Sequence, residues 1–321
     1  MSSDGSDIGI GVSVGRYIDS RREDLSKSSL QNHEYQLKRW IEYCDRVGVQ
    51  TLSDVDPFAV DMFRRDRAAS VAGVTLYNCL VVLRLYLRYC ARMDWIDDRI
   101  PKSIVMPSRD GSSRSTSIST ERIEDILDYL SEYETGSVNH LTVALTWHCG
   151  FRIGSLRAID VSDIYIDERY IQIRHRPKTG TPLKNGKDGE RDVVLSAAYT
   201  GVIRSALDRY QRSADPNGRV PLMSTSLSDG RLNPSSIRKN IYNVTDCAGP
   251  SDICGCESVC DRSVSPHDIR RSAITHWLRQ GHDSELLSGR FDVSVDVMSE
   301  HYDVRSMADK RETRREQLGL D

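Results

Sequence analysis

The chain has 321 residues and a mass of 36.3 kDa, the size of two average domains. Hydrophobic residues make up 38% of it and charged residues 28%, which predicts a sizeable core, and no apolar run is long enough to span a membrane. The formal net charge is −3, so the chain as a whole is not the polycation expected of many nucleic-acid-binding proteins. The start of the chain lacks a basic, then apolar, secretory signal, which favours a cytoplasmic location.

The first third of the chain is predicted to be a small helical domain. Residues 1–14 are rich in Ser, Gly and Asp and are expected to be a flexible tail, and helical spacing of apolar residues follows over 15–107. Within the helix predicted over 75–92, a basic row stands beside the apolar stripe: Arg84, Arg88 and Arg92. Such a row alone is most often a solvated face, and it favours DNA binding only if the second domain has DNA chemistry.

A second domain is predicted over 118–321, after a Ser-, Gly- and Arg-rich linker at 108–117. Amphipathic helices open it, and helical patterns dominate its later part. Between them lie three β-like runs, and the last two are joined by a loop rich in Gly, Pro and Lys. The predicted fold class is therefore mainly α with a small antiparallel β-sheet.

Four segments of this second domain contain chemically reactive or charged residues in a fixed order. They are Arg152 in HCGFRIGSLRAID, Lys184 and Lys187 in TPLKNGKDGERDVVL, His267 and Arg270 in SPHDIRRSAITHWL, and Tyr302 in SEHYD. Each residue alone has an ordinary structural explanation, such as a salt bridge, a helix cap or a core tyrosine. The ordered set is the informative feature.

In order and spacing, these segments resemble the active-site boxes of the tyrosine recombinases, the phage integrase family. The form of the lysine loop and of the SPHDIRR and HYD segments is most similar to archaeal members. The helical first domain resembles the family's SAM-like core-binding domain, and the second its catalytic domain. The resemblance implies a site-specific recombinase or integrase that cleaves and rejoins duplex DNA through a 3′-phosphotyrosyl intermediate, and that forms a tetramer on paired sites.

The resemblance also implies a role for each residue. Arg152 and Arg270 would bind the non-bridging phosphate oxygens, which suit planar guanidinium groups. Tyr302 would be the nucleophile, His267 would assist it, and a loop lysine would protonate the departing 5′ oxygen. Lys184 matches the family's short turn best, with Lys187 second. The phosphotyrosyl bond conserves the energy of the broken linkage, so no cofactor is expected for catalysis.

Two positions depart from the family pattern. Ser155 stands where the family usually has an acidic residue, and Arg290 stands where it usually has His or Trp. We expect Arg290 to act as a cationic donor to the phosphate. The departures keep two other functions open, namely a non-catalytic DNA-binding regulator derived from a recombinase and a type IB topoisomerase-like DNA-relaxing enzyme.

The basic residues gather near these segments although the net charge is negative. Between Arg174 and Arg191 the chain has six Lys or Arg against Asp188 and Glu190. The expected partner is therefore double-stranded DNA, which would bring the protein to the nucleoid. The residues expected to contact its phosphates are Arg84, Arg88, Arg92, Lys178, Lys187 and Arg191.

Four of the eight cysteines crowd into one short loop just before the His267 segment. They are Cys247, Cys254, Cys256 and Cys260. Their C-x6-C-x-C-x3-C spacing has no standard C-x2-C pair, yet a Gly- and Ser-rich loop offers thiols no apolar face to pack into. A structural zinc is the preferred hypothesis, and reduced or disulfide-bonded thiols in a surface insertion are an equally weighted alternative.

Overall fold

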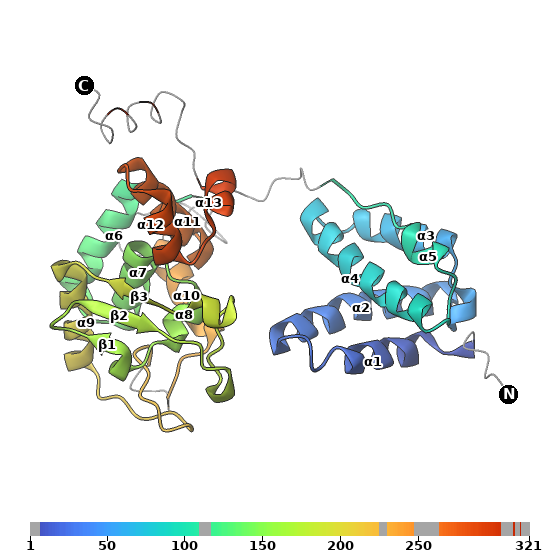
Figure 1. The fold of residues 1–321 in the computed structure, drawn as a ribbon, viewed down its shortest axis with the longest axis horizontal. Coiled ribbons are helices and arrows are strands. Elements are labelled where there is room, and N and C mark those ends of the chain that lie inside the picture. The colour runs from blue at the N-terminus through green and yellow to red at the C-terminus, as the bar shows by residue number, and fades with distance from the viewer. Residues whose placement is uncertain are drawn as a thin grey trace. The chain divides into compact units, whose positions relative to one another are not determined.

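The computed structural model describes residues 7–108, 117–224, 230–246 and 263–302, together with Arg311 and Arg315. The chain divides into two compact units, Met1–Arg114 and Ser115–Asp321 (Figure 1). The described residues are mainly helical and include one small antiparallel sheet, which confirms the predicted fold class. None of the helices among them is long and apolar enough to cross a membrane. Apart from its two ends, the segment expected to be a linker lies outside the described residues.

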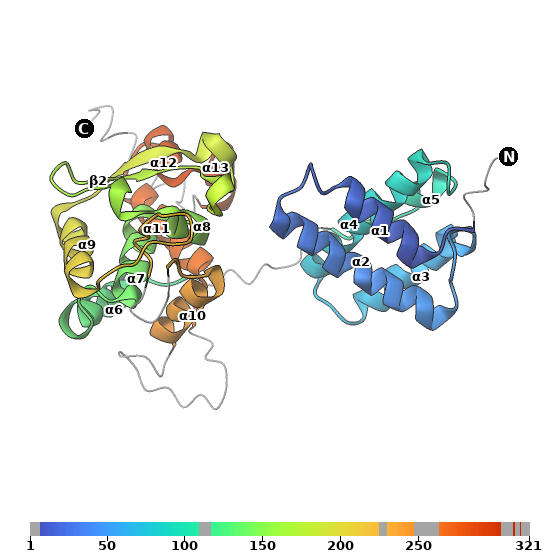
Figure 2. The same cartoon turned by 90° about the horizontal axis from the view of Figure 1, so that it is seen from below.

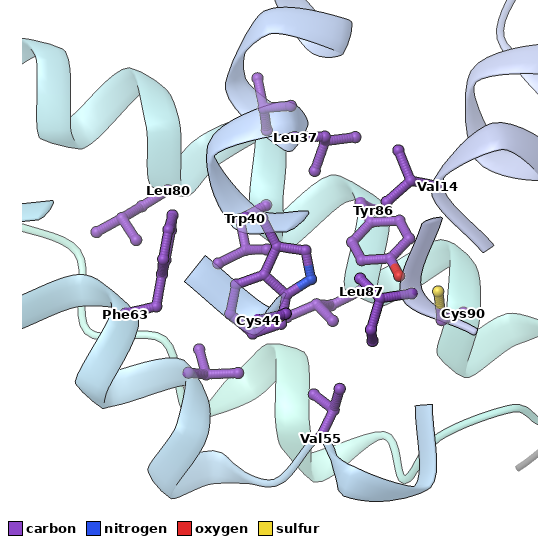
Figure 3. Close-up of a cluster of buried hydrophobic side chains, with 14 of the residues drawn as sticks. Val14, Leu37, Trp40, Cys44, Val55, Phe63, Leu80, Tyr86, Leu87 and Cys90 are labelled. Atoms are coloured by element: carbon purple, nitrogen blue, oxygen red, sulfur yellow. The ribbon is translucent and has the colours of Figure 1, made fainter. Parts of the chain in front are cut away.

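The first unit is a helical bundle built around one helix, α4. Its helices within residues 7–108 are α1 (Ile10–Ser20), α2 (Lys27–Val47), α3 (Pro57–Ala68), α4 (Gly73–Arg92) and α5 (Arg99–Lys102). Helix α4 packs against all four others. In the core between α2, α3 and α4, the ring of Trp40 meets that of Phe63 edge to face at 5.1 Å, and Leu80 and Leu87 pack around them (Figure 3). Burial of such side chains is the main source of the unit's stability.

The first helix begins earlier than the sequence analysis expects. Residues 1–14 are predicted to be a tail, but α1 starts at Ile10, and both Ile10 and Val14 are buried in the core. The two glycines Gly11 and Gly15 lower helix propensity by about 1 kcal/mol each. Apolar residues at helical spacing nevertheless give the segment a face that the bundle buries, and this gain outweighs the propensity. Residues 1–6 lie outside the described residues.

The second unit is arranged around helix α7. Its described helices are α6 (Thr120–Tyr133), α7 (Val138–Cys149), α8 (Ile153–Ala158), α9 (Ala197–Arg209), α10 (Pro234–Thr245), α11 (Pro266–Arg279), α12 (Ser284–Phe291) and α13 (Val295–His301). Helix α7 packs against α6, α8, α9, α10 and α11 and is buried along nearly its whole length. Figure 2 shows the unit from below, with α7 and α11 near its middle. Helix α7 thereby brings together segments that precede it and segments that follow it in the sequence.

The sheet lies beside these helices, and a long loop connects its last two strands. Its strands are β1 (Ile164–Tyr165), β2 (Tyr170–Ile173) and β3 (Arg191–Val194), antiparallel and in the order β1-β2-β3. Ile171 pairs with Val193 in register, and both are buried in the core. The β2–β3 connection, residues 174–190, contains all three lysines predicted to act at the site or on DNA.

Candidate active site

The turn between α7 and α8 fixes the first arginine. Helix α7 ends at Gly150, whose φ of 56° is left-handed, and a side chain there would collide with the Phe291 ring. Two residues later Arg152 is the N-cap residue of α8. Glycine is therefore required at the turn that sets the start of α8 and the place of Arg152.

Arg270 is the most deeply buried of the predicted site residues. A capping box between Ser265 and Asp268 fixes the start of α11, and Arg270 follows within the second turn at 1% exposure. Its Nη1 donates to the Gly150 carbonyl and its Nη2 to the Phe291 carbonyl at 2.6 Å. Arg270 thus ties α11 to the α7–α8 turn and to the end of α12. Within the described residues, its buried Nε meets no acceptor.

Arg152 pairs with a residue that the sequence analysis does not single out, Asp292. The Arg152 Nη1 donates to Oδ2 of Asp292, and its Nη2 donates to the Asp292 carbonyl at 2.8 Å. The second carboxylate oxygen, Oδ1, accepts a hydrogen bond from Asn185 Nδ2 at 2.8 Å. Ser155, which stands at the family's usual acidic position, is itself buried, and the carboxylate partner of Arg152 comes from the end of α12 instead.

Arg191, which the sequence predicts to contact DNA, is half-buried and is also part of this group. Its Nε donates to the Arg290 carbonyl at 2.9 Å and its Nη1 to the Gly189 carbonyl at 2.8 Å. The guanidinium carbon lies 5.6 Å from the centre of the Phe151 ring. Its Nη2 is buried without an acceptor among the described residues. Burial lowers the pKa of Arg191 to about 10.

Tyr302 lies at the end of α13, close enough to Arg270 for the two to interact electrostatically. Its peptide N–H donates to the Met298 carbonyl at 3.0 Å, and its own carbonyl accepts from Thr275 Oγ1 at 3.0 Å. The side chain is 7% exposed and packs in an apolar cluster formed by α11, α12 and α13. The guanidinium carbon of Arg271 stands 6.0 Å from the centre of its ring. The nucleophile candidate is therefore held in place by both backbone and side-chain contacts.

The electrostatics of the group are dominated by positive charge. Burial, and then the positive charge of Arg152, lower the pKa of Arg270, while the charge of Tyr302 acts in the opposite direction. The ring of His267 reaches the surface at the start of α11. Protein atoms around the ring, and then Arg270, lower the pKa of His267 below its ordinary value. Protons are therefore repelled from this corner of the unit, and anions are attracted to it.

Arg290, another expected phosphate contact, has a guanidinium that hydrogen-bonds to backbone carbonyls within the fold, as that of Arg270 does. Its Nη1 donates to the Val194 carbonyl at 2.9 Å and its Nη2 to the His148 carbonyl at 3.0 Å. The guanidinium carbon also stands 4.8 Å from the centre of the Trp277 ring. These contacts join β3, α7 and α11. Arg290 thus links these three elements, and its backbone carbonyl accepts the hydrogen bond from Arg191.

The loop lysines are all exposed, but their neighbours differ. Lys178 and Lys187 lie in short 3-10 turns at Pro177–Thr179 and Gly186–Gly189. Lys184 follows Leu183, whose N–H donates to His175 Nδ1 at 3.0 Å, and it precedes Asn185, which binds Asp292. Lys184 is therefore flanked on both sides by residues that are anchored. This local geometry distinguishes it from Lys187, the second choice for the general acid.

In the first unit, the basic row on α4 is divided. Arg84 is half-buried and donates through Nη2 to the Ile104 carbonyl at 3.1 Å. Arg88 and Arg92 are exposed and, with Arg21 among others, line a surface cavity of about 430 Å³. Two of the three arginines are thus available to an external anion, whereas Arg84 supports the fold.

The predicted zinc ligands Cys247, Cys254, Cys256 and Cys260 lie outside the described residues. Among the residues that the structure does describe, no group of His, Cys, Asp and Glu is arranged to hold a metal ion. The four described cysteines are free and buried. They are Cys44, Cys79, Cys90 and Cys149.

Comparison with known proteins places this arrangement in a family. The model of the phage integrase family matches residues 116–303. Tyrosine recombinase XerD of Mycobacterium leprae (strain TN) is 21% identical over 282 residues, which are 82% of this chain and 82% of that protein.

Two solved structures share the fold. The integrase of transposon Tn1549, in complex with a circular intermediate DNA, aligns with a TM-score of 0.75 at 13% identity, covering 97% of this chain and 100% of that one. A lambda integrase tetramer bound to a Holliday junction aligns with a TM-score of 0.65 at 13% identity, covering 96% and 82%. The fold is therefore that of the integrases.

The family model spans more than half of the chain, and the four predicted segments fall within it in the expected order. The chain belongs to the phage integrase family and is, by that membership, a tyrosine-type site-specific recombinase.

Proposed function

We propose that this protein cleaves and rejoins duplex DNA through a phosphotyrosyl intermediate at Tyr302. The phenolic oxygen forms a bond to the scissile phosphorus, the bond from phosphorus to the 5′ oxygen breaks, and the 3′ end stays attached to the protein. In the reverse step a 5′ hydroxyl attacks the phosphotyrosine and releases Tyr302. The intermediate keeps the energy of the phosphodiester, so we expect catalysis to need neither a nucleotide nor a metal.

The observation that carries this proposal is the excess of positive charge among the described residues near Tyr302. Arg270 is buried, and within the described part of the chain its hydrogen bonds go to carbonyl oxygens and not to a carboxylate. A buried cation of this kind is costly, and an incoming phosphate offsets that cost. Donors that are already in place are usually the largest contribution to catalysis where charge develops. Arg152 and Arg270 are the two donors that we assign to the phosphate.

Two proton transfers accompany the proposed cleavage. The lowered pKa of His267 leaves its ring neutral near pH 7, so that it is able to accept the proton of Tyr302. Lys184, between its two anchored neighbours, donates a proton to the 5′ oxygen as that oxygen leaves. The same groups act with exchanged roles in the rejoining step.

Covalent capture on randomised DNA tests the proposal and identifies the recombination site in the same experiment. The full chain is incubated with a pool of nicked duplexes that carry a randomised central sequence, and adducts that survive denaturation are isolated. We expect an adduct that is lost in Tyr302→Phe, and sequencing of the captured DNA then identifies the site. If duplex binds but no adduct forms under any tested condition, a non-catalytic regulator is the better description.

The activity on closed circular DNA separates the two enzymatic functions. We expect a recombinant product from two copies of the captured site on one plasmid. Relaxation of the plasmid without recombinant product would instead indicate a type IB topoisomerase-like activity. The lambda integrase relative is a tetramer on a Holliday junction. By extension we propose that four copies of this chain assemble on two paired sites, which a mobility shift with two bound duplexes would reveal.

The structural zinc stays a prediction because its cysteines lie outside the described residues. Metal analysis of the purified full chain tests it directly. One equivalent of zinc, lost together with folded structure on chelation, is the expected result, and a metal-free folded protein would contradict it. We further propose a cytoplasmic, nucleoid-associated location, in keeping with a substrate that is chromosomal or mobile DNA.

A further inference from the structure

A single aspartate, Asp292, connects two parts of the proposed machinery that are far apart in the sequence. Its carboxylate binds the guanidinium of Arg152 through Oδ2 and the amide of Asn185 through Oδ1, and its carbonyl binds Arg152 again. The side chain is 10% exposed, so water competes little for these bonds. Asn185 directly follows Lys184. One carboxylate thus contacts the first phosphate-binding arginine and the turn that contains the general acid.

The backbone at Asp292 is held in an unusual conformation. Its φ of 54° and ψ of 55° are left-handed, and its N–H donates to the Ser288 carbonyl at the end of α12. Left-handed backbone is uncommon outside glycine, although aspartate tolerates it better than most residues. Non-glycine residues held in this way cluster at functional sites. The conformation directs both the carbonyl and the carboxylate of Asp292 toward Arg152.

The loop needs such a contact at its tip. The β2–β3 connection is long, and the general acid that we assign to it is an exposed lysine. Catalytic groups must be held to within about half an ångström of their productive position. At the tip, the hydrogen bond from Asn185 to Asp292 joins the loop to α12, and the loop backbone at Gly189 passes beside the same carboxylate.

We propose that Asp292 is a positioning residue for strand cleavage, which orients Arg152 toward the phosphate and, through Asn185, holds Lys184 at the leaving oxygen. This inference rests on the proposed phosphotyrosyl mechanism and adds to it a division of labour. Asn185 acts only on the lysine, whereas Asp292 acts on both the lysine and the arginine. The two effects are separable by a change in the leaving group.

The experiment compares two nicked duplexes that carry the captured site and differ in one atom. In one, the scissile phosphate is joined to a 5′ oxygen, which needs a proton to leave. In the other it is joined to a 5′ sulfur, which leaves as a thiolate without a proton. Single-turnover cleavage at saturating protein is measured for Asn185→Ala, Asp292→Asn and Lys184→Ala. Asp188→Asn, which removes an exposed carboxylate from the same loop, is the matched control.

We expect Asn185→Ala to slow cleavage of the oxygen duplex by about 10- to 100-fold, a part of the 10²–10⁴ that a general acid contributes. The sulfur duplex should restore it to within a few-fold of the wild type, as it should for Lys184→Ala. Asp292→Asn keeps the size of the side chain but weakens the pairing with Arg152. It should therefore slow both duplexes, and the oxygen duplex more. Asp188→Asn should leave both rates unchanged.

Several results would overturn the inference. One is an Asn185→Ala variant that cleaves the oxygen duplex at the wild-type rate, and another is a defect that the sulfur duplex does not relieve. Faster cleavage by Asp292→Asn would mean that the carboxylate blocks the phosphate site instead of arranging it. Melting temperatures close to that of the wild type establish that the variants fold. If the wild type itself forms no adduct, it is the proposed function that fails and not this division of labour.

Discussion

Two clusters of arginines in the second unit look alike in burial but differ in charge balance. The first, which we call the balanced cluster, joins three arginines to three aspartates through ion pairs, in which Arg231 and Asp160 are each 4% exposed. Its members are Arg176, Arg219, Arg231, Asp160, Asp163 and Asp215. The second, the site cluster, has three arginines and, among the described residues, ion-pairs with one carboxylate. Its members are Arg152, Arg191, Arg270 and Asp292.

The difference shows how one residue type serves two purposes. In the balanced cluster the hydrogen bond that Arg176 donates to Asp163 raises the pKa of Arg176, whereas in the site cluster burial lowers the pKa of Arg191. Arginine stays charged in both settings. A buried charge with partners is a structural element, and a buried charge without them attracts an anion from outside. We propose that a DNA phosphate neutralises the excess positive charge of the site cluster.

Both clusters act on the same loop. Arg219 in the balanced cluster donates through Nη1 to Thr179 Oγ1 at 2.6 Å and to Thr181 Oγ1 at 2.9 Å, near the beginning of the β2–β3 connection. Asp292 in the site cluster holds the tip through Asn185. Because the site cluster holds the part of the loop next to Lys184, we expect changes in the balanced cluster to lower mainly stability and changes in the site cluster to lower mainly activity.

The largest expected effect is on stability, from Asp160→Ala in the balanced cluster. The substitution leaves Arg219 and Arg231 buried without one of their carboxylates, which typically costs about 3–5 kcal/mol. We expect a large fall in the free energy of unfolding, measured by denaturant titration. At a temperature where the variant stays folded, its rate of adduct formation should stay near that of the wild type. A stable Asp160→Ala variant would remove the distinction between the clusters.

Arg270→Lys in the site cluster should have the converse effect. Lysine keeps the charge but lacks the fork that reaches both the Gly150 and Phe291 carbonyls. Loss of one preorganised donor costs about 10²–10³-fold in rate, or about 2.7–4 kcal/mol. We expect a loss of that size in single-turnover cleavage, with duplex affinity largely kept. Arg279→Lys, an exposed position on the same helix, is the control and should cleave normally.

The sequence predicts which residues form this site better than it predicts how their charges are paired. The order of Arg152, Arg270 and Tyr302 follows from local motifs, and the structure brings these residues together from three separate segments. The part played by Asp292 has no local signal, because its contacts depend on a left-handed residue at the end of α12. The phosphate contact of Arg290 stays a prediction, and the hydrogen bonds that Arg290 makes within the fold have no local signal either. Its partners are backbone carbonyls of distant segments, which side-chain patterns do not encode.

A smaller effect is expected from pH, through the buried His148 that neighbours Arg290. Burial, and then Arg290, lower the pKa of His148 to about 3, from 6.5 in the unfolded chain. Between those values the unfolded state binds more protons, so the free energy of unfolding falls as the pH falls below about 6.5. The loss from this group between pH 7 and pH 5 is about 2 kcal/mol, at 1.36 kcal/mol per pH unit.

Thermal unfolding across that pH range checks the assignment. His148→Gln does not titrate, and its amide oxygen is able to accept the N–H of Ser196, the present partner of His148 Nε2 at 3.3 Å. Between pH 7 and pH 5 the free energy of unfolding of the variant should therefore fall by about 2 kcal/mol less than that of the wild type, and the variant should stay folded at pH 7. An unchanged slope in the variant would assign the acid sensitivity to other groups.

The smallest effect is expected in the first unit, where water solvates the charges of the exposed Arg88 and Arg92. Each phosphate contact made by such an exposed residue releases counterions from the DNA. A plot of the logarithm of the binding constant against the logarithm of the salt concentration therefore has a slope of about −0.9 per contact. Changing both to Gln should weaken duplex binding a few-fold at moderate salt and reduce that slope by about 2, with no change in cleavage at saturating DNA. Arg84→Gln is the matched control, because its guanidinium already binds the Ile104 carbonyl and its loss should lower the melting temperature without moving the slope. Equal slopes in all three proteins would mean that DNA does not contact this face of α4.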